Sequence, residues 1–298
     1  MSDYNIIMYI VEDDKNMSSP LFHDLKGLVY KRNKIPINIL YHSYYFFGDY
    51  RITIGGDKIT FYKIAPVSRE YRVLKNEMTE FYNNHCVKGK KNILVYGGHE
   101  IHIYIDGMRN TNSTFFEHIK GLELLILDSC YSSTTSILSH VMDKTEYVIA
   151  CQSASPYRGF IGSDFLEILN SKKYGRETKY KKIVKSFIVR NNLKNKALTK
   201  CNYRTDGVLV EMSRYKDMVE SSGLISEFKR TSSARLEDVK NYNYYDLVEL
   251  VRCKADRGCT GVIKKIKKCV RYHKKNRLCK RFLSREGKAL NGISVWIE

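Results

Sequence analysis

Two stretches decide the fold of this chain: Ile-Leu-Val-Tyr-Gly-Gly-His at residues 93–99 and Leu-Leu-Ile-Leu-Asp-Ser-Cys at residues 124–130. Each is an apolar run that stops at a residue type common in catalysis, His99 in the first and Cys130 in the second. Strands of a parallel sheet are buried on both faces, so they appear as continuous apolar runs. Sites in open α/β sheets form at the carboxyl ends of such strands. The two runs therefore predict a site in which a thiol nucleophile has an imidazole partner.

The rest of the chain continues this alternation of apolar strands and segments at helical spacing. The expected strands are 4–11, 37–41, 93–96, 101–105, 122–127, 147–150, 207–211 and 292–297, and a hairpin within 44–64 turns at Gly55-Gly56. The expected helices are 18–30, 68–83, 134–142, 161–171, 179–192, 213–228, 234–252 and 259–283. The pattern predicts an α/β protein with a mainly parallel sheet, helices on both faces and a more helical C-terminal part.

The composition is that of a globular protein, with 298 residues, 43% apolar residues and four prolines. Eight cysteines occur without a CxxC pair, and the first ten residues lack the basic start of a signal peptide. No apolar stretch approaches the ~20 residues of a membrane span. We therefore expect a soluble, cytoplasmic protein with reduced thiols. Heavy use of Lys, Asn, Ile and Tyr suggests an AT-rich genome, such as that of a large DNA virus or a parasite.

The net charge of +19 is large and unevenly distributed along the chain. Residues 264–288 contain twelve Lys and Arg residues and one acid. Apolar residues at helical spacing in this stretch favour an amphipathic helix with a solvated basic face. A patch that binds nucleic acid or another anionic surface is the alternative, because a strongly basic field attracts polyanions.

The two strand ends resemble motifs of the caspase-like cysteine peptidases. Tyr-Gly-Gly-His at 96–99 resembles the Tyr-Ser-Gly-His of metacaspases, and Asp-Ser-Cys-Tyr-Ser at 128–132 resembles their Asp-Ser-Cys-His-Ser. Over the whole chain, the closer resemblance is to the clostripain family. It rests on the opening strand with its acidic turn at 12–14 and on the segments 147–160, 206–213 and 291–296. The resemblance implies a caspase-like catalytic core over 1–175 and a helical C-terminal extension over 176–298 that returns to the core with a final strand.

The resemblance implies a cysteine endopeptidase with a Cys/His dyad. Cys130 is expected to attack the scissile carbonyl, and His99 to protonate the leaving amine. The backbone N–H groups of Cys130 and Glu100 are expected to bind the oxyanion. Because the family has glycine where this chain has Glu100, a carboxylate stands beside the dyad and disfavours further negative charge there.

Substrate preference is implied in the same way. Asp128 matches the family position that lines the first substrate pocket, where a carboxylate pairs with Arg or Lys. Cleavage after Arg or Lys is therefore expected, with Asp128 and Ser153 as substrate-binding residues, although Gln152 and Ser153 stand where the family segment is acidic. Arg109, in the polar loop between the two motifs, is the expected self-cleavage site. No metal or cofactor is predicted from the residues; calcium is the one ion that the resemblance allows.

Two other functions remain open at this point. A pseudo-peptidase would keep the fold, lose efficient catalysis because of Glu100, and act as a binding or structural protein. A nucleic-acid-associated protein would act through the basic stretch at 264–288. The expected partners are accordingly protein or peptide substrates, with nucleic acid or an anionic surface as the alternative.

Overall fold

The computed structural model describes most of the chain. The described residues are 2–12, 28, 33–43, 48–56, 58–65, 71–98, 116–153, 159–191, 205–222, 235–239, 242–253, 259–275 and 290–297. The predicted strand at 101–105, the loop at 106–113 and, apart from residue 28, the predicted helix at 18–30 lie outside them.

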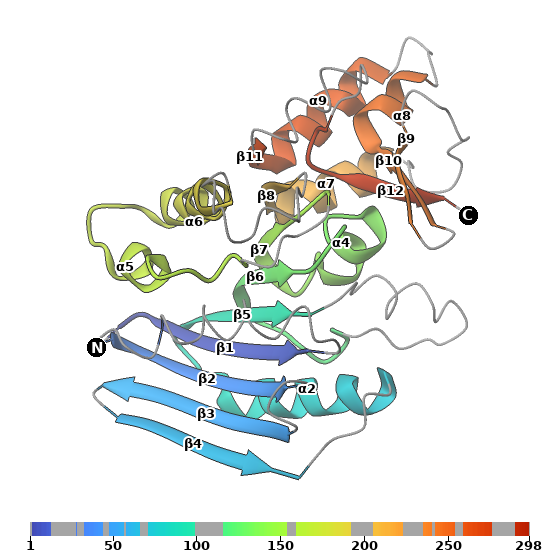
Figure 1. The fold of residues 1–298 in the computed structure, drawn as a ribbon. Helices are drawn as coiled ribbons and strands as arrows, with labels where there is room; N and C mark the ends of the chain where they lie inside the picture. Colours follow the sequence, from blue (N-terminus) through green and yellow to red (C-terminus); the bar gives the residue numbers. More distant parts are fainter. Residues whose placement is uncertain are drawn as a thin grey trace.

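Within the described residues, nine strands form one sheet in the order β11-β8-β7-β6-β5-β1-β2-β3-β4 (Figure 1). They are β1 (Tyr4–Val11), β2 (Asn33–Ser43), β3 (Gly48–Gly56), β4 (Lys58–Ile64), β5 (Lys91–Gly97), β6 (Leu122–Asp128), β7 (Thr145–Ala150), β8 (Asp206–Glu211) and β11 (Val270–Lys275). The central strands β2, β1, β5, β6 and β7 run parallel, and antiparallel strands extend the sheet on both sides. This confirms the predicted mainly parallel sheet.

The central strands are buried on both faces, as continuous apolar runs require. Every residue of β1 and β6 is buried. Alternate residues enter two separate cores, because successive side chains of a strand point to opposite faces. In β6, for example, Leu125 and Leu127 join one core while Leu124 and Ile126 join the other.

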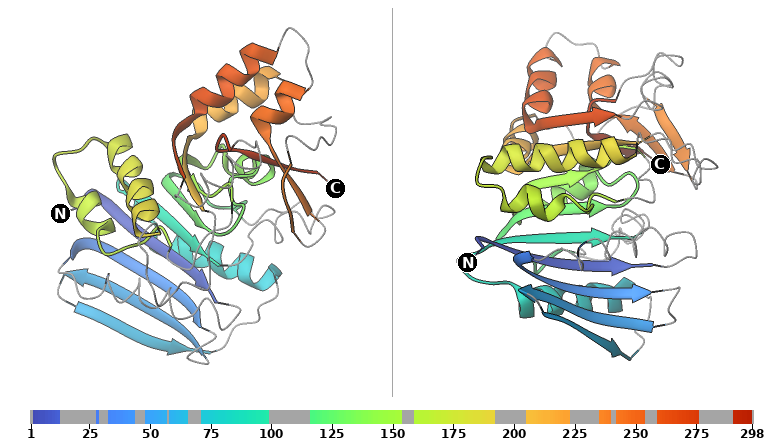
Figure 2. Two further views of the ribbon diagram at one scale, coloured as in Figure 1. Left: turned by 45° about the horizontal axis from the view of Figure 1, so that its top comes forward. Right: turned by 60° about the vertical axis from the view of Figure 1, so that its left-hand side comes forward.

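Helices cover both faces of the sheet (Figure 2). One core takes side chains from α2 (Tyr71–His85), α4 (Thr135–Val141), α7 (Met212–Ser222), α8 (Leu247–Cys253) and α9 (Cys259–Cys269). The opposite core takes side chains from α5 (Phe165–Asn170) and α6 (Arg176–Arg190). The predicted helices at 68–83, 134–142 and 179–192 are confirmed, with ends shifted by a few residues. The predicted helix at 161–171 is shorter than expected.

The C-terminal part departs from the sequence prediction in two places. The predicted helix at 234–252 is wrong over its first half, where β9 (Arg235–Val239) and β10 (Tyr242–Asp246) pair with each other. β10 also pairs with β12 (Ser294–Ile297), which makes a second, three-stranded sheet. The predicted helix at 259–283 ends at Cys269, and the strand β11 follows it without a break.

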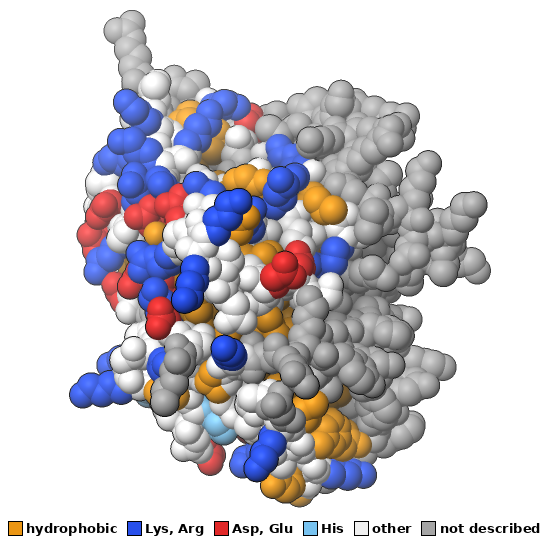
Figure 3. All heavy atoms as spheres, turned by 90° about the vertical axis from the view of Figure 1, so that its left-hand side faces the viewer, with side chains coloured by type: hydrophobic (Ala, Val, Ile, Leu, Met, Phe, Trp, Pro, Cys, Tyr) orange, Lys and Arg blue, Asp and Glu red, His pale blue; other side chains and the backbone are white. Residues whose placement is uncertain are grey.

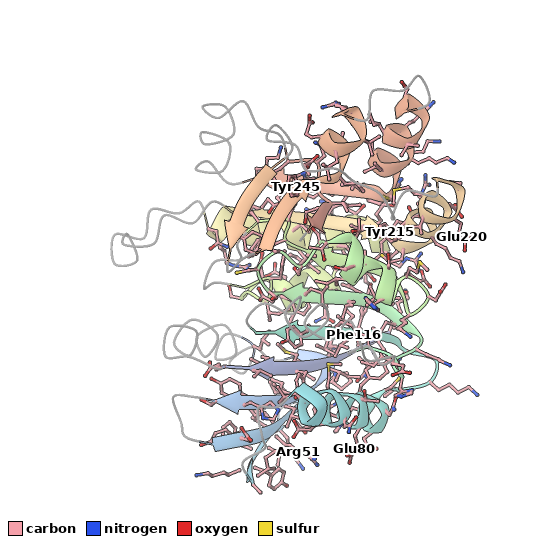
Figure 4. All side chains as sticks on the ribbon, turned by 90° about the vertical axis from the view of Figure 1, so that its right-hand side faces the viewer. Arg51, Glu80, Phe116, Tyr215, Glu220 and Tyr245 are labelled. Atoms are coloured by element: carbon pink, nitrogen blue, oxygen red, sulfur yellow. The ribbon has the colours of Figure 1, made fainter. Side chains whose placement is uncertain are left out.

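The C-terminal part is joined closely to the sheet. Both β8 and β11 lie beyond residue 175, yet they form one edge of the nine-stranded sheet. Tyr215 of α7, labelled in Figure 4, reaches α4: its hydroxyl lies 3.1 Å from Thr135 O and 3.1 Å from Ser139 Oγ. The division into parts at residue 175 stays a prediction. No helix among the described residues combines the length and the apolar character needed to span a bilayer.

Candidate active site

The two strand ends that the sequence singles out lie side by side. β5 and β6 are parallel neighbours, and Gly97 is the register partner of Asp128. Immediately beyond, the N–H of Gly98 donates to Asp128 O at 3.3 Å. The chain that leads to His99 therefore starts next to the chain that leads to Cys130. His99 itself, Glu100 and Arg109 lie outside the described residues, so the dyad and the oxyanion donor at 100 stay predictions.

Cys130 lies in a sharp turn between β6 and α4. Its thiol is half-buried and forms no disulfide bond among the described residues. The next residue, Tyr131, has a φ of 51° and is the only non-glycine residue of the described chain with a positive φ. Such a conformation costs on the order of 1–3 kcal/mol and persists where the surroundings impose it. The turn that presents the thiol is therefore strained, a feature that concentrates at functional sites.

Ser132 holds this turn in place. Its buried Oγ lies 2.9 Å from Ser129 O and 3.1 Å from Leu127 O, and it accepts the N–H of Cys151 at 3.1 Å. The N–H of Ser133 donates to Cys151 O at 2.9 Å. The turn is thus bonded both to the end of its own strand and to the segment that follows the neighbouring strand β7.

Asp128, the predicted substrate carboxylate, is at the end of β6 and only 8% exposed. Its Oδ2 accepts the N–H of Phe160 at 3.0 Å. The neighbouring Gly159 packs tightly against it, because a Cβ at position 159 would lie 1.7 Å from Asp128 Oδ2. Arg190 of α6 fixes this segment by donating to Gly159 O at 2.8 Å and to Phe160 O at 3.2 Å. Asp128 is therefore held at the edge that also presents Cys130.

Ser153, the second predicted substrate-binding residue, lies beside the same turn. Its carbonyl accepts the N–H of Tyr131 at 3.1 Å. Its hydroxyl donates to Asp206 Oδ1 at 2.5 Å, and its N–H donates to the same oxygen at 2.8 Å. The structure thus brings Cys130, Asp128 and Ser153 to one edge of the sheet, and it ties the Ser153 hydroxyl to a buried carboxylate.

That carboxylate, Asp206 at the start of β8, is fully buried. Burial alone would raise its pKa, but the hydrogen bonds from His273 and Ser153 outweigh burial and lower it. The bond from His273 Nε2 to Asp206 Oδ2 is 2.7 Å long. Asp206 is therefore a buried charge with partners on both of its oxygens.

A second buried carboxylate, Asp246 of β10, holds the adjacent Gln152. Gln152 Nε2 donates to Asp246 Oδ2 and to Ile293 O, both at 2.8 Å, and Gln152 Oε1 accepts the N–H of Gly292 at 2.7 Å. Asn291 donates to Asp246 through its backbone and its side chain, at 2.7 and 2.9 Å. Burial raises the pKa of Asp246 in spite of these bonds. Gln152 and Ser153, which stand where the clostripain segment is acidic, are thus each held by a distant acid: Gln152 by Asp246 and Ser153 by Asp206.

Sequence reasoning missed Asp206, Asp246 and His273 as neighbours of the site. The helices expected from sequence at 234–252 and 259–283 contain Asp246 and His273, whereas the structure places both residues in strands. No local signal could have found them, since each reaches the site through pairing of distant strands. The described residues contain no group of three or more His, Cys, Asp and Glu side chains suited to a metal ion.

The basic stretch is only partly described, from 264 to 275. In α9, Ile266 and Cys269 are buried while the four lysines of 264–268 are exposed, which agrees with an amphipathic helix. On the face shown in Figure 3, Lys and Arg side chains outnumber acidic side chains, and acids lie among them in part of the face. Arg271, for example, lies 3.1 Å from Glu177 and 3.3 Å from Glu211. The described part of the basic stretch therefore gives no support to nucleic acid as the alternative partner.

Solved structures share this fold. An inactive zymogen C11 protease from Parabacteroides distasonis matches with a TM-score of 0.71 and 12% identity, over 100% of this chain and 92% of its own. A secreted C11 cysteine protease from Bacteroides thetaiotaomicron, bound to an irreversible peptide inhibitor, matches with a TM-score of 0.70 and 13% identity, over 100% and 93%. No protein-family model and no curated sequence matches the chain. The chain therefore has the fold of the clostripain-type C11 cysteine proteases, in agreement with the sequence resemblance.

Proposed function

We propose that the protein is a cysteine endopeptidase that cleaves after Arg or Lys, with Cys130 as nucleophile and His99 as its proton-transfer partner. The observation that supports this most strongly is the position of Cys130. It lies in a strained turn at the carboxyl end of β6, beside the end of the strand that leads to His99. The two solved structures named above, which match 100% of this chain, are C11 proteases.

The proposed reaction is an acyl transfer through a thioester. The Cys130 thiolate attacks the scissile carbonyl carbon, a C–S bond forms, and the carbonyl electrons move to oxygen. The N–H groups of Cys130 and Glu100 donate to that oxygen. The intermediate collapses, the C–N bond breaks, and the departing nitrogen takes a proton from His99. Water then hydrolyses the thioester and restores the thiol.

Specificity for Arg or Lys would come from Asp128. Its carboxylate is almost fully buried, and one oxygen accepts a backbone N–H. A substrate cation at this edge would meet a carboxylate in a site with little water, and Arg could bind it through two parallel hydrogen bonds. The Bacteroides thetaiotaomicron protease that shares this fold was solved with an irreversible peptide inhibitor, which supports peptides as the class of substrate.

Self-cleavage after Arg109 is part of the same proposal. The residue is basic, as the proposed specificity requires, and it lies between the two catalytic motifs. The intact mass of purified wild type, compared with Cys130→Ala, tests it. Two fragments that meet at position 109 in wild type, and one chain in the variant, would support self-cleavage. A single chain in both would refute it.

Hydrolysis of a peptide library varied at the residue before the cut tests the proposed function as a whole, with wild type and Cys130→Ala side by side. Cleavage after Arg or Lys that disappears in Cys130→Ala is the expected result. Folded protein that cleaves nothing, with or without calcium, would instead favour the pseudo-peptidase. Glu100→Gly would then show whether the carboxylate at that position prevents catalysis.

A further inference from the structure

We propose that Asp206 and His273 are positioning residues for the Cys130 site. Together they would hold the segment 151–153 against the turn that presents the nucleophile. The expected effect on catalysis rests on the proposed function. The positioning of residues 151–153 rests on hydrogen bonds alone. The C-terminal strand β11 would thus support the site indirectly, through His273 and Asp206, without touching the reacting atoms.

The first step is the set of bonds around Asp206. Its Oδ1 accepts the N–H of Gln152 at 3.1 Å, the N–H of Ser153 at 2.8 Å and the hydroxyl of Ser153 at 2.5 Å. Its Oδ2 accepts His273 Nε2 at 2.7 Å. One carboxylate thus fixes two consecutive backbone amides, and a single imidazole orients the carboxylate from its other side. Bonds to an ionised acceptor are about twice as strong as neutral ones.

The second step links this segment to the nucleophile. Ser153 O accepts the N–H of Tyr131, and Cys151 O accepts the N–H of Ser133. The Tyr131 N–H belongs to the peptide group that contains the carbonyl of Cys130, so its bond sets the plane of that peptide. Tyr131 is also the residue with a φ of 51°. A shift of the segment 151–153 would therefore act directly on the strained peptide beside the thiol.

The third step explains how His273 reaches Asp206. β11 pairs antiparallel with β8 at the edge of the sheet, with His273 opposite Val208 and Lys275 opposite Asp206. Diagonal neighbours two residues apart share one face of an antiparallel pair and lie within reach of long side chains. The imidazole is 12% exposed and the carboxylate is not exposed at all. His273 is therefore the partner that keeps a buried charge satisfied.

The experiment compares wild type with His273→Gln, His273→Asn and His273→Ala. Gln places an amide N–H near the position of Nε2, whereas the shorter Asn does not. The kcat for a lysyl or arginyl peptide is measured per molecule of reactive enzyme, whose concentration is taken from covalent labelling of Cys130 in a separate sample. It is expected to fall by about 10- to 100-fold in His273→Ala, as a small misplacement of catalytic groups would cause. His273→Gln is expected to recover most of the loss, and His273→Asn less. His85→Ala is the matched control, because among the described residues its imidazole bonds only within its own helix, to Phe81 O at 2.8 Å.

Amide hydrogen exchange of the same proteins separates this inference from the proposed function, since it needs no activity. Exchange in peptides that cover 129–133 and 151–153 is expected to speed up at least tenfold in His273→Ala and to stay slow in His273→Gln and His85→Ala. If His273→Ala does not fold, the comparison of the other two variants decides: His273→Gln should have higher kcat and slower exchange than His273→Asn. Unchanged exchange in these peptides, or equal behaviour of Gln and Asn, would overturn the inference. A wild type that hydrolyses no peptide, together with the expected exchange pattern, would refute the proposed function and leave this inference standing.

Discussion

Gly159 and Asp128 are in such close contact that no side chain fits between them: a Cβ at position 159 would lie 1.7 Å from Asp128 Oδ2. The carboxylate is fixed on that side by the N–H of Phe160. The contact joins the segment after β7 to the end of β6, and it sets the position of the proposed specificity residue.

Gly159→Ala is therefore expected to displace Asp128. Overpacking at a buried contact typically costs about 1–3 kcal/mol, which urea unfolding would measure. The folded fraction should also cleave lysyl and arginyl peptides less selectively. Gly261→Ala is the matched control, because a Cβ there meets nothing within 4 Å in the helix α9, and Ala stabilises a helix by about 0.5–1 kcal/mol relative to Gly. Equal stability of the two variants would contradict this account of Gly159.

Asp128→Asn tests the charge without changing the shape of the residue. The amide cannot pair with a cation as a carboxylate does, and hydrogen bonds to charged groups are worth about 1.5–3 kcal/mol. We expect kcat/KM for lysyl and arginyl peptides to fall about 10- to 100-fold. Asp143→Asn, at an acid paired with Lys216 on the surface, should leave kcat/KM unchanged. A normal preference for basic residues in Asp128→Asn would assign specificity to another group.

Ser132 and Ser133 are adjacent, equally buried and differently bonded, which makes them a matched pair. Ser132 Oγ bonds to Cys151 N and to two carbonyls. Ser133 Oγ has no hydrogen-bond partner among the described residues. Ser132→Ala should lower the free energy of unfolding by about 1–3 kcal/mol, because it leaves buried groups unpaired. Ser133→Ala should be neutral or slightly stabilising, and a larger loss in Ser133→Ala than in Ser132→Ala would count against the bonds described for the turn.

His42 predicts a dependence of stability on pH. The buried imidazole lies between Asp49 and Glu77, with Nδ1 3.1 Å from Asp49 Oδ1 and Nε2 2.7 Å from Glu77 Oε2. Burial lowers the pKa of His42, but the two carboxylates outweigh burial and raise it above its ordinary value of 6.5. Folding therefore favours the protonated form. The resulting stability is fully present below about pH 6.5 and is lost as the pH rises through the raised pKa.

Urea unfolding of wild type and His42→Gln at pH 6 and at pH 9 measures this effect. The advantage of wild type over the variant should be larger at pH 6 than at pH 9, by about 1.4 kcal/mol for each unit by which the pKa is raised. His85→Gln serves as control and should follow wild type at both values. An advantage that is equal at the two pH values, or larger at pH 9, would show that His42 folds in its neutral form.

The central sheet and the turn at Cys130 could be predicted from sequence because their signals are local. Residues 124–127, for example, are an unbroken apolar run, as is typical of a strand buried on both faces. Asp128 and Cys130 share an edge of the sheet because both lie at the carboxyl end of the same strand, β6. The strained φ of Tyr131 has no sequence signal, because it is imposed by the bonds to Ser153 and Cys151.

The C-terminal elements could not be predicted for the same physical reason. Tyr242–Asp246 becomes a strand because it pairs with Ser294–Ile297, about fifty residues later, and helical periodicity within the segment gives no information on that partner. His273 likewise reaches Asp206 only because Val270–Lys275 pairs with β8. The residues that support the proposed site are thus placed by pairing between distant strands, which leaves no local signal in the sequence. The proposed reacting groups lie at strand ends, which the sequence does reveal.

The most direct test of the central claim is to map the adduct of a peptidyl acyloxymethyl ketone ending in lysine on the intact, folded protein. One adduct per chain at Cys130, none in Cys130→Ala and much slower formation in His99→Ala is the result expected of a nucleophile with an imidazole partner. Iodoacetamide would show in parallel that the thiols of the sample are reduced. Adducts only at other cysteines, or at Cys130 no faster than at an ordinary exposed thiol, would contradict the assignment of Cys130 as an activated nucleophile.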